Sequence, residues 1–285
     1  MPQSFRPEMS QAGLSPTRSV TAVDEYRNTR ELEIADEQPL TIYLDRQEVV
    51  TLMTLGTQPE LLTLGYLRNQ GLVKSIKDIK SIHVDWSVNA VAVATFSEDQ
   101  DWHERLKSRT VTTGCGQGTI FGNIMEELGN IHLKPVSIKQ SAIYELLKNI
   151  NAFNEVYKKS GAVHGCALCS GTEVTCFIED VGRHNAVDAI AGHMWLEDIP
   201  GDDKLFYTTG RLTSEMVIKV SQMGIPVLLS RSGITNMGLE IARDTGVMLL
   251  SRCNSKHFLV YNGSENIIFD VSLPPKLSVA NIKTS

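Results

Sequence analysis

Apolar and polar residues alternate with period two through much of the first part of the chain. Residues 31–34, 40–44 and 49–54 show this alternation and predict strands. Between Pro59 and Gly71 the apolar positions take helical spacing, which predicts a helix over residues 60–69. Residues 76–96 then predict a hairpin pair of strands. Together these elements predict a small α+β domain.

The pattern changes from about residue 160 onward. Short apolar runs predict strands, and helical stretches lie between them; the predicted strands are residues 173–178, 205–208, 226–229, 247–250 and 258–261. Strand–helix alternation at these lengths indicates βαβ units and a largely parallel sheet covered by helices. Two further helices are predicted over residues 120–128 and 141–158.

These patterns divide the chain into four parts. We expect an α/β protein, α+β overall, with a disordered tail over residues 1–20 and an N-terminal α+β domain over 21–135. An α/β domain should follow over 136–271 and a loose tail over 272–285.

Composition excludes several classes of protein. The 285 residues are 42% hydrophobic and 21% charged with a net charge of -6, which argues against a broad nucleic-acid or anionic-membrane surface. No apolar stretch approaches the roughly 20 residues that span a bilayer, and residues 1–18 lack the apolar core of a secretory signal. We therefore expect a cytoplasmic protein in which the five cysteines are reduced.

One cysteine stands in a loop between glycines and threonines. Cys115 lies in the sequence Val-Thr-Thr-Gly-Cys-Gly-Gln-Gly-Thr of residues 111–119, which shows no apolar periodicity. The flanking glycines remove steric cover from the thiol. Cys115 is therefore a candidate nucleophile or persulfide carrier, and the alternative is a flexible loop without a chemical role.

Four predicted strand-end turns combine glycine or serine with arginine. Helix N-termini at such turns offer free N–H groups to an anion, and arginine adds paired donors for phosphate oxygens. The combination predicts a polyanionic ligand such as a nucleotide, although the arginines could instead pair with Glu179, Asp180, Glu215 and Asp244. The turns are Gly182-Arg183, Gly210-Arg211, Arg231-Ser232-Gly233 and Ser251-Arg252.

Two clusters of polar or thiol residues have competing interpretations. Glu179-Asp180 with Arg183-His184-Asn185 can form an acid–base and anion site, or merely the capped start of a helix. His164-Gly-Cys166-Ala-Leu-Cys169 has a metal or redox spacing, but a second close pair of zinc ligands and the deaminase carboxylate are missing. The small residues around these cysteines favour a packed helix instead, and Cys176 is expected in the core.

Several long motifs make the chain similar to the FdhD family, the accessory sulfurtransferases of formate dehydrogenase. The motifs are Glu-Asp-Val-Gly-Arg-His-Asn-Ala-Val-Asp at 179–188, Thr-Gly-Arg-Leu-Thr-Ser-Glu-Met-Val at 209–217, and Gly-Ile-Pro at 224–226 followed by Ser-Arg-Ser at 230–232. The similarity extends through Gly161–His164 and back to Cys115. It covers nearly the whole chain except the two tails.

This resemblance implies a cytoplasmic sulfur carrier. A cysteine desulfurase would load sulfur onto Cys115, and the protein would pass it to the molybdenum of the bis-molybdopterin guanine dinucleotide cofactor before insertion into formate dehydrogenase. The cofactor would be a bound substrate, with no permanent metal. The resemblance also implies a cytidine-deaminase-like, three-layer αβα C-terminal domain without deaminase catalysis, and a homodimer.

The expected cofactor-binding residues fall into two groups. The resemblance places the family's C-terminal binding segment on Leu250, Ser251, Arg252, Cys253, Asn254 and Ser255. At the other turns we expect Arg183, His184, Gly210, Arg211, Ser230 and Arg231 to contact the cofactor.

The chain departs from the family pattern at two places. Many members have Cys-x-x-Cys in the loop, whereas Gly118 takes the second position here and leaves Cys115 as the one carrier. Cys166 and Cys169 replace small residues, so one of them is a candidate resolving thiol. The alternatives to a sulfur carrier are a non-catalytic chaperone for the molybdenum cofactor and a zinc-dependent nucleoside deaminase.

Overall fold

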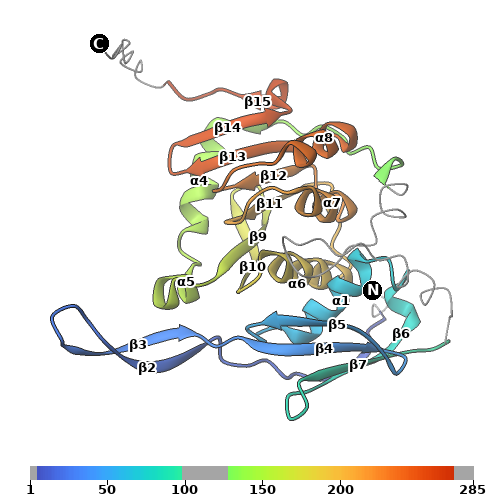
Figure 1. The fold of residues 1–285 in the computed structure, drawn as a ribbon. Coiled ribbons are helices and arrows are strands. Elements are labelled where there is room, and N and C mark those ends of the chain that lie inside the picture. The colour runs from blue at the N-terminus through green and yellow to red at the C-terminus, as the bar shows by residue number, and fades with distance from the viewer. Residues whose placement is uncertain (1–4, 98–127, 273–285) are drawn as a thin grey trace.

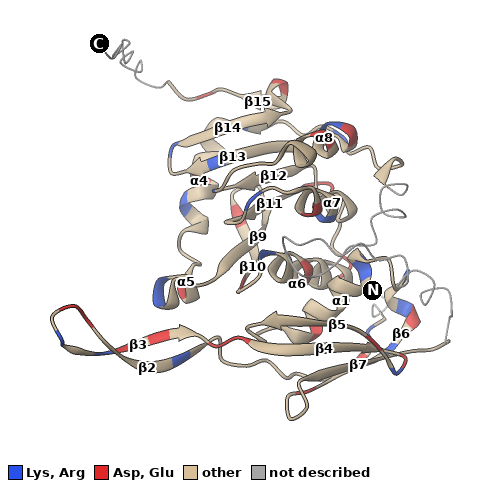
Figure 2. Cartoon of the chain, in the orientation of Figure 1, with Lys and Arg blue, Asp and Glu red and all other residues tan. Residues whose placement is uncertain are grey.

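Two β-sheets, one in each domain, lie on either side of a pair of packed helices, α1 (Pro59–Asn69) and α6 (Arg183–Leu196) (Figure 1). The computed structural model describes residues 5–97 and 128–272. Acidic and basic residues are scattered over both domains (Figure 2).

The N-terminal sheet has five strands in the order β1-β6-β7-β4-β5. Its alternating sequences bury one face, as Leu40, Ile42 and Leu44 on β4 show, and α1 packs over that face. The predicted hairpin is the antiparallel pair β6–β7, and η1 is a short 3₁₀ turn before it. The elements are β1 (Glu8–Met9), β4 (Gln38–Leu44), β5 (Gln47–Thr54), η1 (Ile76–Asp78), β6 (Ile79–Asp85) and β7 (Ala90–Thr95).

The prediction of a disordered tail over residues 1–20 is wrong for residues 5–20. Strand β1 pairs in parallel with β6, and the Trp86 indole N–H donates to the Ala12 carbonyl at 2.6 Å. Ser10 and the Ala12 N–H both bind the Glu60 carboxylate, at 2.7 and 2.9 Å. This polar segment is held by its backbone and by single polar contacts, which hydrophobic periodicity does not reveal.

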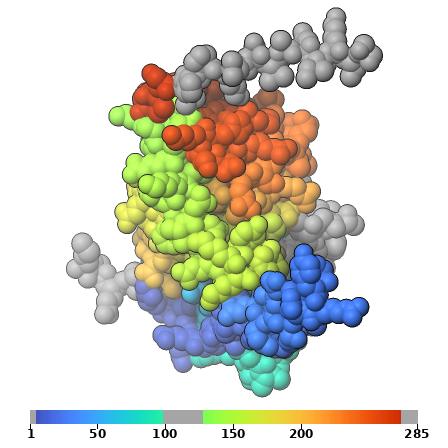
Figure 3. All heavy atoms as spheres, turned by 90° about the vertical axis from the view of Figure 1, so that its left-hand side faces the viewer, coloured from blue at the N-terminus to red at the C-terminus, as the bar shows by residue number. Residues whose placement is uncertain are grey.

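A two-stranded hairpin projects beneath the C-terminal domain. It consists of β2 (Thr17–Val23) and β3 (Thr29–Ala35), which form a separate sheet. Glu33 on β3 lies 3.7 Å from Lys159, and Figure 3 shows the blue hairpin next to the yellow-green segment that carries this lysine. The predicted strand over residues 31–34 is thus confirmed as part of β3.

The C-terminal sheet has six strands in the order β10-β9-β11-β12-β13-β14. Only the neighbours β11–β12 and β12–β13 are parallel, so the expectation of a largely parallel sheet is wrong, because antiparallel hairpins close both of its edges. The strands are β9 (His164–Ser170), β10 (Glu173–Asp180), β11 (Lys204–Thr208), β12 (Val227–Ser230), β13 (Met248–Asn254) and β14 (His257–Asn262).

Helices cover both faces of this sheet. Apolar residues of α4 share one core with one face, while α6, α7 and α8 share the other core with the opposite face. The predicted three-layer αβα domain is therefore confirmed. The remaining elements are β8 (Ile138–Lys139), α4 (Gln140–Ile150), α5 (Glu155–Ser160), α7 (Ser214–Gln222), α8 (Asn236–Thr245), η2 (Ser264–Asn266) and β15 (Ile267–Ile268).

Two predicted helices differ from the structure. The single helix expected over residues 141–158 is divided into α4 and α5 around Asn151. The segment His164–Cys169, expected to be a helix, is strand β9, which is buried between two neighbouring strands and two helical layers. A strand covered on both faces needs small apolar residues throughout, so its sequence shows no alternation. The predicted helix over 120–128 lies outside the described residues except for residue 128.

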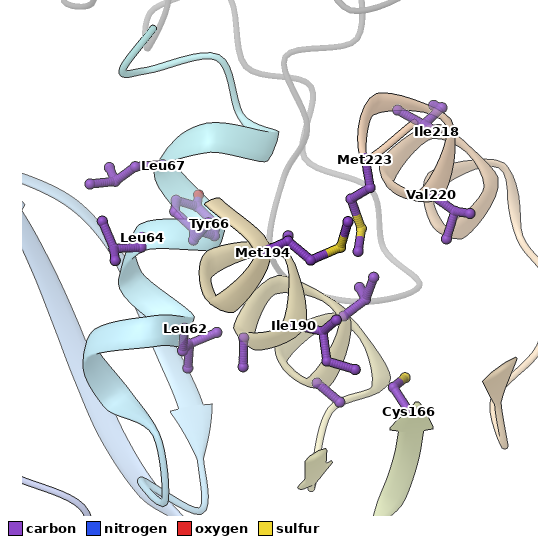
Figure 4. Close-up of a cluster of buried hydrophobic side chains, with 14 of the residues drawn as sticks. Leu62, Leu64, Tyr66, Leu67, Cys166, Ile190, Met194, Ile218, Val220 and Met223 are labelled. Carbon is purple, nitrogen blue, oxygen red and sulfur yellow. The ribbon is translucent and has the colours of Figure 1, made fainter. Parts of the chain in front are cut away.

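The domains meet where α1 crosses α6. A Cβ atom on Gly65 would stand 1.7 Å from the Asp188 carbonyl oxygen, and one on Gly192 would stand 1.9 Å from the Leu61 carbonyl oxygen. Only glycine lets the two backbones come this close. Around the crossing lie apolar side chains of α1 and α6, including Leu62 and Ile190, together with Met223, which directly follows α7 (Figure 4).

Candidate anion site

The turns at the carboxyl ends of the central strands are joined by hydrogen bonds. Thr208, the last residue of β11, accepts the Gly210 N–H at 3.1 Å. Ser230, the last residue of β12, donates to the Gly210 carbonyl at 2.6 Å and accepts the Ser232 N–H at 2.8 Å. These bonds fix the turns relative to each other. The Ser230 side chain is fully buried, and its hydroxyl is engaged in holding the turns together.

The same pattern links the outer turns. The Leu212 N–H donates to the Gly233 carbonyl at 2.9 Å, and the Arg252 N–H donates to the Ser232 carbonyl at 3.0 Å. Arg252 has a φ of 55°. Its guanidinium lies beside Gly233, where an added Cβ would stand 3.7 Å from Nη2. The turns after β11 and β12 therefore lie in one continuous row with Arg252 of strand β13.

Three of the predicted arginines gather around His164. Burial lowers the pKa of His164, and the positive charges of Arg183, Arg231 and Arg211 lower it further. Gly210 makes room for this arrangement, because a Cβ there would stand 2.5 Å from the Arg183 Cδ. His164 Nδ1 lies 3.2 Å from the Thr209 hydroxyl, which also accepts the Gly165 N–H at 3.1 Å.

Three of the four predicted turn arginines do not support the alternative in which they pair with carboxylates. Arg211, Arg231 and Arg252 are exposed, and over residues 5–97 and 128–272 none of the three forms an ion pair. Arg231 instead lies over the ring of Tyr157, with 5.5 Å between its Cζ and the ring centroid. Tyr157 was not expected at the site, because residues 141–158 carry no local signal beyond a helix.

A pocket of about 390 Å³ lies beside His164 and Arg183, between the two domains. The N-terminal wall is the edge strand β5, whose contribution could not be foreseen from sequence. The lining residues are Glu37, Thr51, Leu52, Met53, His164 and Val181–Asn185. The Asn185 amide donates to the Met53 carbonyl at 2.6 Å and so joins the walls.

The adjacent carboxylates Glu179 and Asp180 hold backbone in place. Asp180 accepts hydrogen bonds from the Thr54 hydroxyl at 2.5 Å, the Asn185 amide at 2.8 Å and the Leu55 N–H at 3.2 Å. Burial raises the pKa of Asp180, and these bonds oppose the shift. Glu179 accepts the N–H groups of Val156 and Tyr157 at 2.8 and 2.9 Å. Asp180 thus positions the N-terminal domain, and Glu179 positions α5.

His184, a predicted cofactor contact, is almost completely buried. Its Nε2 lies 3.5 Å from a Glu215 carboxylate oxygen. Burial lowers the pKa of His184 far below its ordinary value, and the nearby charge of Lys219 lowers it further. His184 is thus a neutral side chain in the floor of the pocket beside His164 and Arg183. It is not a cation that would bind phosphate.

The predicted C-terminal binding segment is only partly accessible. Strand β13 runs through Asn254, so residues 251–254 do not form the expected turn. The side chains of Leu250, Ser251 and Cys253 are buried, whereas Arg252, Asn254 and Ser255 are exposed. Contact of this segment with a cofactor stays a prediction.

The described cysteines are poorly suited to sulfur chemistry. Burial raises the pKa of Cys166, Cys169 and Cys253 to about 12 and that of half-buried Cys176 to about 11. Cys166 and Cys169 belong to the cores on opposite faces of the sheet, which argues against a shared metal or a disulfide. The burial and raised pKa values of Cys166 and Cys169 therefore argue against either of them acting as a resolving thiol. Cys115 lies outside the described residues.

No helix in the described part of the chain is long and apolar enough to cross a membrane. No group of three or more histidine, cysteine, aspartate or glutamate side chains there is placed to hold a metal ion.

Comparison with known proteins gives consistent matches. Residues 35–268 match the FdhD/NarQ family. The sulfur carrier protein FdhD of Listeria innocua is 30% identical over 241 residues, which is 83% of this chain and 92% of that protein. The protein of the same name from Bacillus subtilis is 28% identical over 232 residues, covering 81% and 88% of the two chains. A crystal structure described as a formate dehydrogenase accessory protein, from Desulfotalea psychrophila, is 25% identical with a TM-score of 0.69, covering 88% of this chain and 98% of that one.

Proposed function

Because the chain belongs to the FdhD/NarQ family, we propose that it is a sulfur carrier that serves formate dehydrogenase. In this proposal Cys115 takes sulfur from a cysteine desulfurase and delivers it to the molybdenum of the bis-molybdopterin guanine dinucleotide cofactor. The protein acts in the cytoplasm as a homodimer and releases the sulfurated cofactor to formate dehydrogenase.

The strand-end turns that carry Arg183, Arg211 and Arg231 lie side by side next to His164, and this arrangement carries the proposal. Arg183 is the first residue of α6, and Arg211 and Arg231 lie in the turns before α7 and α8, whose N-terminal N–H groups would favour a bound anion. Guanidinium groups bind phosphate oxygens with paired hydrogen bonds. The diphosphate that joins the pterin to guanosine in this cofactor has the negative charge that such a cluster binds.

The chemistry of the described cysteines favours Cys115 as carrier by elimination. A persulfide carrier must form a thiolate and be reached by two partners in turn. Cys166, Cys169, Cys176 and Cys253 are buried or half-buried with raised pKa values. Cys115 is the remaining cysteine of the sequence.

The proposed transfer has two steps. The Cys115 thiolate attacks the outer sulfur of the desulfurase persulfide, forming one S–S bond while the desulfurase S–S bond breaks and its thiolate leaves. The Cys115 persulfide then gives its outer sulfur to the molybdenum as sulfide. The two electrons for this step come from a dithiol reductant, which becomes a disulfide, and the Cys115 thiolate is restored.

A mass measurement tests the carrier. The protein is incubated with a cysteine desulfurase and cysteine, and its intact mass is compared with that of Cys115→Ala and Cys166→Ala variants. We expect one added sulfur atom in wild type and Cys166→Ala, and none in Cys115→Ala. An adduct of equal size in Cys115→Ala would overturn the assignment.

A second candidate function is a chaperone that binds the cofactor without carrying sulfur. The anion cluster is compatible with it, because binding needs no thiol. In a strain that lacks this protein, a Cys115→Ala variant that restores formate dehydrogenase activity would favour the chaperone. The zinc deaminase alternative is disfavoured, since Cys166 and Cys169 belong to different cores.

A further inference from the structure

Arg231 and Tyr157 form an exposed cation–π pair at one end of the arginine cluster. The Arg231 Cζ lies 5.5 Å from the centroid of the Tyr157 ring. Tyr157 is 40% exposed, and Arg231 is exposed as well. The Arg231 N–H donates to the Thr208 carbonyl at 3.2 Å, and the hydroxyl of the next residue, Thr209, lies 3.2 Å from His164, so the pair adjoins the proposed phosphate site.

The tyrosine is fixed from two sides. Its backbone N–H, with that of Val156, donates to the buried Glu179 carboxylate at 2.9 and 2.8 Å. Two residues further along α5, Lys159 lies 3.7 Å from Glu33 on the projecting hairpin. Glu179 stands three residues before Gly182, the N-cap of α6, so one short segment supports both the tyrosine and the first arginine.

We propose that the Tyr157–Arg231 pair is the platform on which the planar heterocycle of a nucleoside diphosphate stacks while its phosphates bind the neighbouring arginines. This inference rests on the proposed function and adds the subsite that recognises the base. Aromatic rings and guanidinium planes are the two surfaces that stack best on nucleobases. Stacking tolerates different bases, so the platform selects for a heterocycle rather than for one particular base.

Paired ligands isolate the contribution of the ring. GMP and ribose 5-phosphate share a sugar and a phosphate and differ by the base alone. Calorimetry with GDP, GMP and ribose 5-phosphate is performed on the full chain and on the Tyr157→Ala and Tyr157→Phe variants. Circular dichroism and thermal unfolding verify that each variant is folded.

We expect wild type to bind GMP roughly 5- to 100-fold more tightly than ribose 5-phosphate. Tyr157→Ala should reduce that ratio to about 1 and leave ribose 5-phosphate binding unchanged. Tyr157→Phe should keep the ratio, because the ring and not the hydroxyl stacks. CDP and GDP should bind with affinities within about tenfold of each other.

Three outcomes would overturn the platform. A wild-type ratio near 1 would show that the base is not recognised. An equal loss of GMP and ribose 5-phosphate binding in Tyr157→Ala would show that the ring only holds Arg231 for phosphate. If GDP, GMP and ribose 5-phosphate all fail to bind wild type, the proposed anion site itself is wrong, and the platform falls with it.

Discussion

Lys219 Nζ lies 2.8 Å from Asp188 Oδ2, and the two side chains are 2% and 0% exposed. Asp188 also accepts the Asn69 amide at 2.7 Å, and Lys219 lies 3.8 Å from Glu215. A buried charge is tolerated only when partners replace its water. This pair therefore ties α7 to α6 and, through Asn69, to α1 of the other domain.

Removing one member of the pair should destabilise the fold strongly. Lys219→Met leaves the Asp188 carboxylate buried without its cation, and we expect a loss of about 3–5 kcal/mol in the free energy of unfolding. The double variant Asp188→Asn/Lys219→Met removes both charges and should recover part of this loss. Urea unfolding followed by circular dichroism measures both. A loss below about 1 kcal/mol in Lys219→Met would contradict the importance of the pair.

The helix crossing should not accept even one methyl group. Gly192→Ala would place Cβ 1.9 Å from the Leu61 carbonyl oxygen, so the helices must separate. We expect this to lower the free energy of unfolding by about 1–3 kcal/mol. Gly233→Ala is the matched control, because the nearest atom there would be 3.7 Å away. Thermal unfolding should show a lower midpoint for Gly192→Ala and little change for Gly233→Ala. Equal midpoints for these two variants would count against the close crossing.

Diphosphate binding should couple to protonation of His164. In the free protein the pKa of His164 lies below its ordinary value, and a bound anion would raise it again. Between these two pKa values binding takes up a proton, so the wild type gains affinity as pH falls and loses it as pH rises. GDP itself loses charge in acid, and the comparison is therefore with His164→Gln at each pH. The ratio of wild-type to variant affinity should rise as pH falls from about 8 to about 5.5; a constant ratio refutes the coupling.

Native thiol labelling should separate the cysteines. Cys166, Cys169 and Cys253 are buried with their pKa values raised to about 12, so iodoacetamide at mildly alkaline pH should leave them unmodified in the folded protein. After unfolding in guanidinium chloride all of them should react. Peptide mass spectrometry reads both states. Rapid native labelling of Cys166 would restore it as a candidate resolving thiol.

Local patterning predicted most of the elements. The strands and helices from β10 to β14 follow from short apolar runs separated by glycine-rich turns, and their bounds differ by only a few residues. Strand β9 was misassigned because a strand covered on both faces has no alternation to detect. Residues 5–20 were misassigned because backbone pairing and the Trp86 indole, not hydrophobic spacing, hold them.

The site was predicted where it depends on the turns and missed where it depends on packing between distant elements. Arg183, Arg211 and Arg231 lie at strand-end turns that the sequence displays directly. Tyr157 reaches Arg231 only because Glu179 fixes the start of α5, a contact across 22 residues. The β5 wall of the pocket likewise depends on the crossing of α1 and α6, which no local pattern encodes.

The contact of backbone with backbone at Gly65 and Gly192 bears on how the protein would exchange the ligand proposed above. Helices this close have no intervening side chains to rearrange, so the crossing offers no hinge. We therefore expect the wall formed by Thr51 and Met53 and the wall formed by His164 and Arg183 to keep their separation. In the proposed function the cofactor would then enter and leave through the open side of this pocket, and the timing of its release would depend on the partner that takes it away.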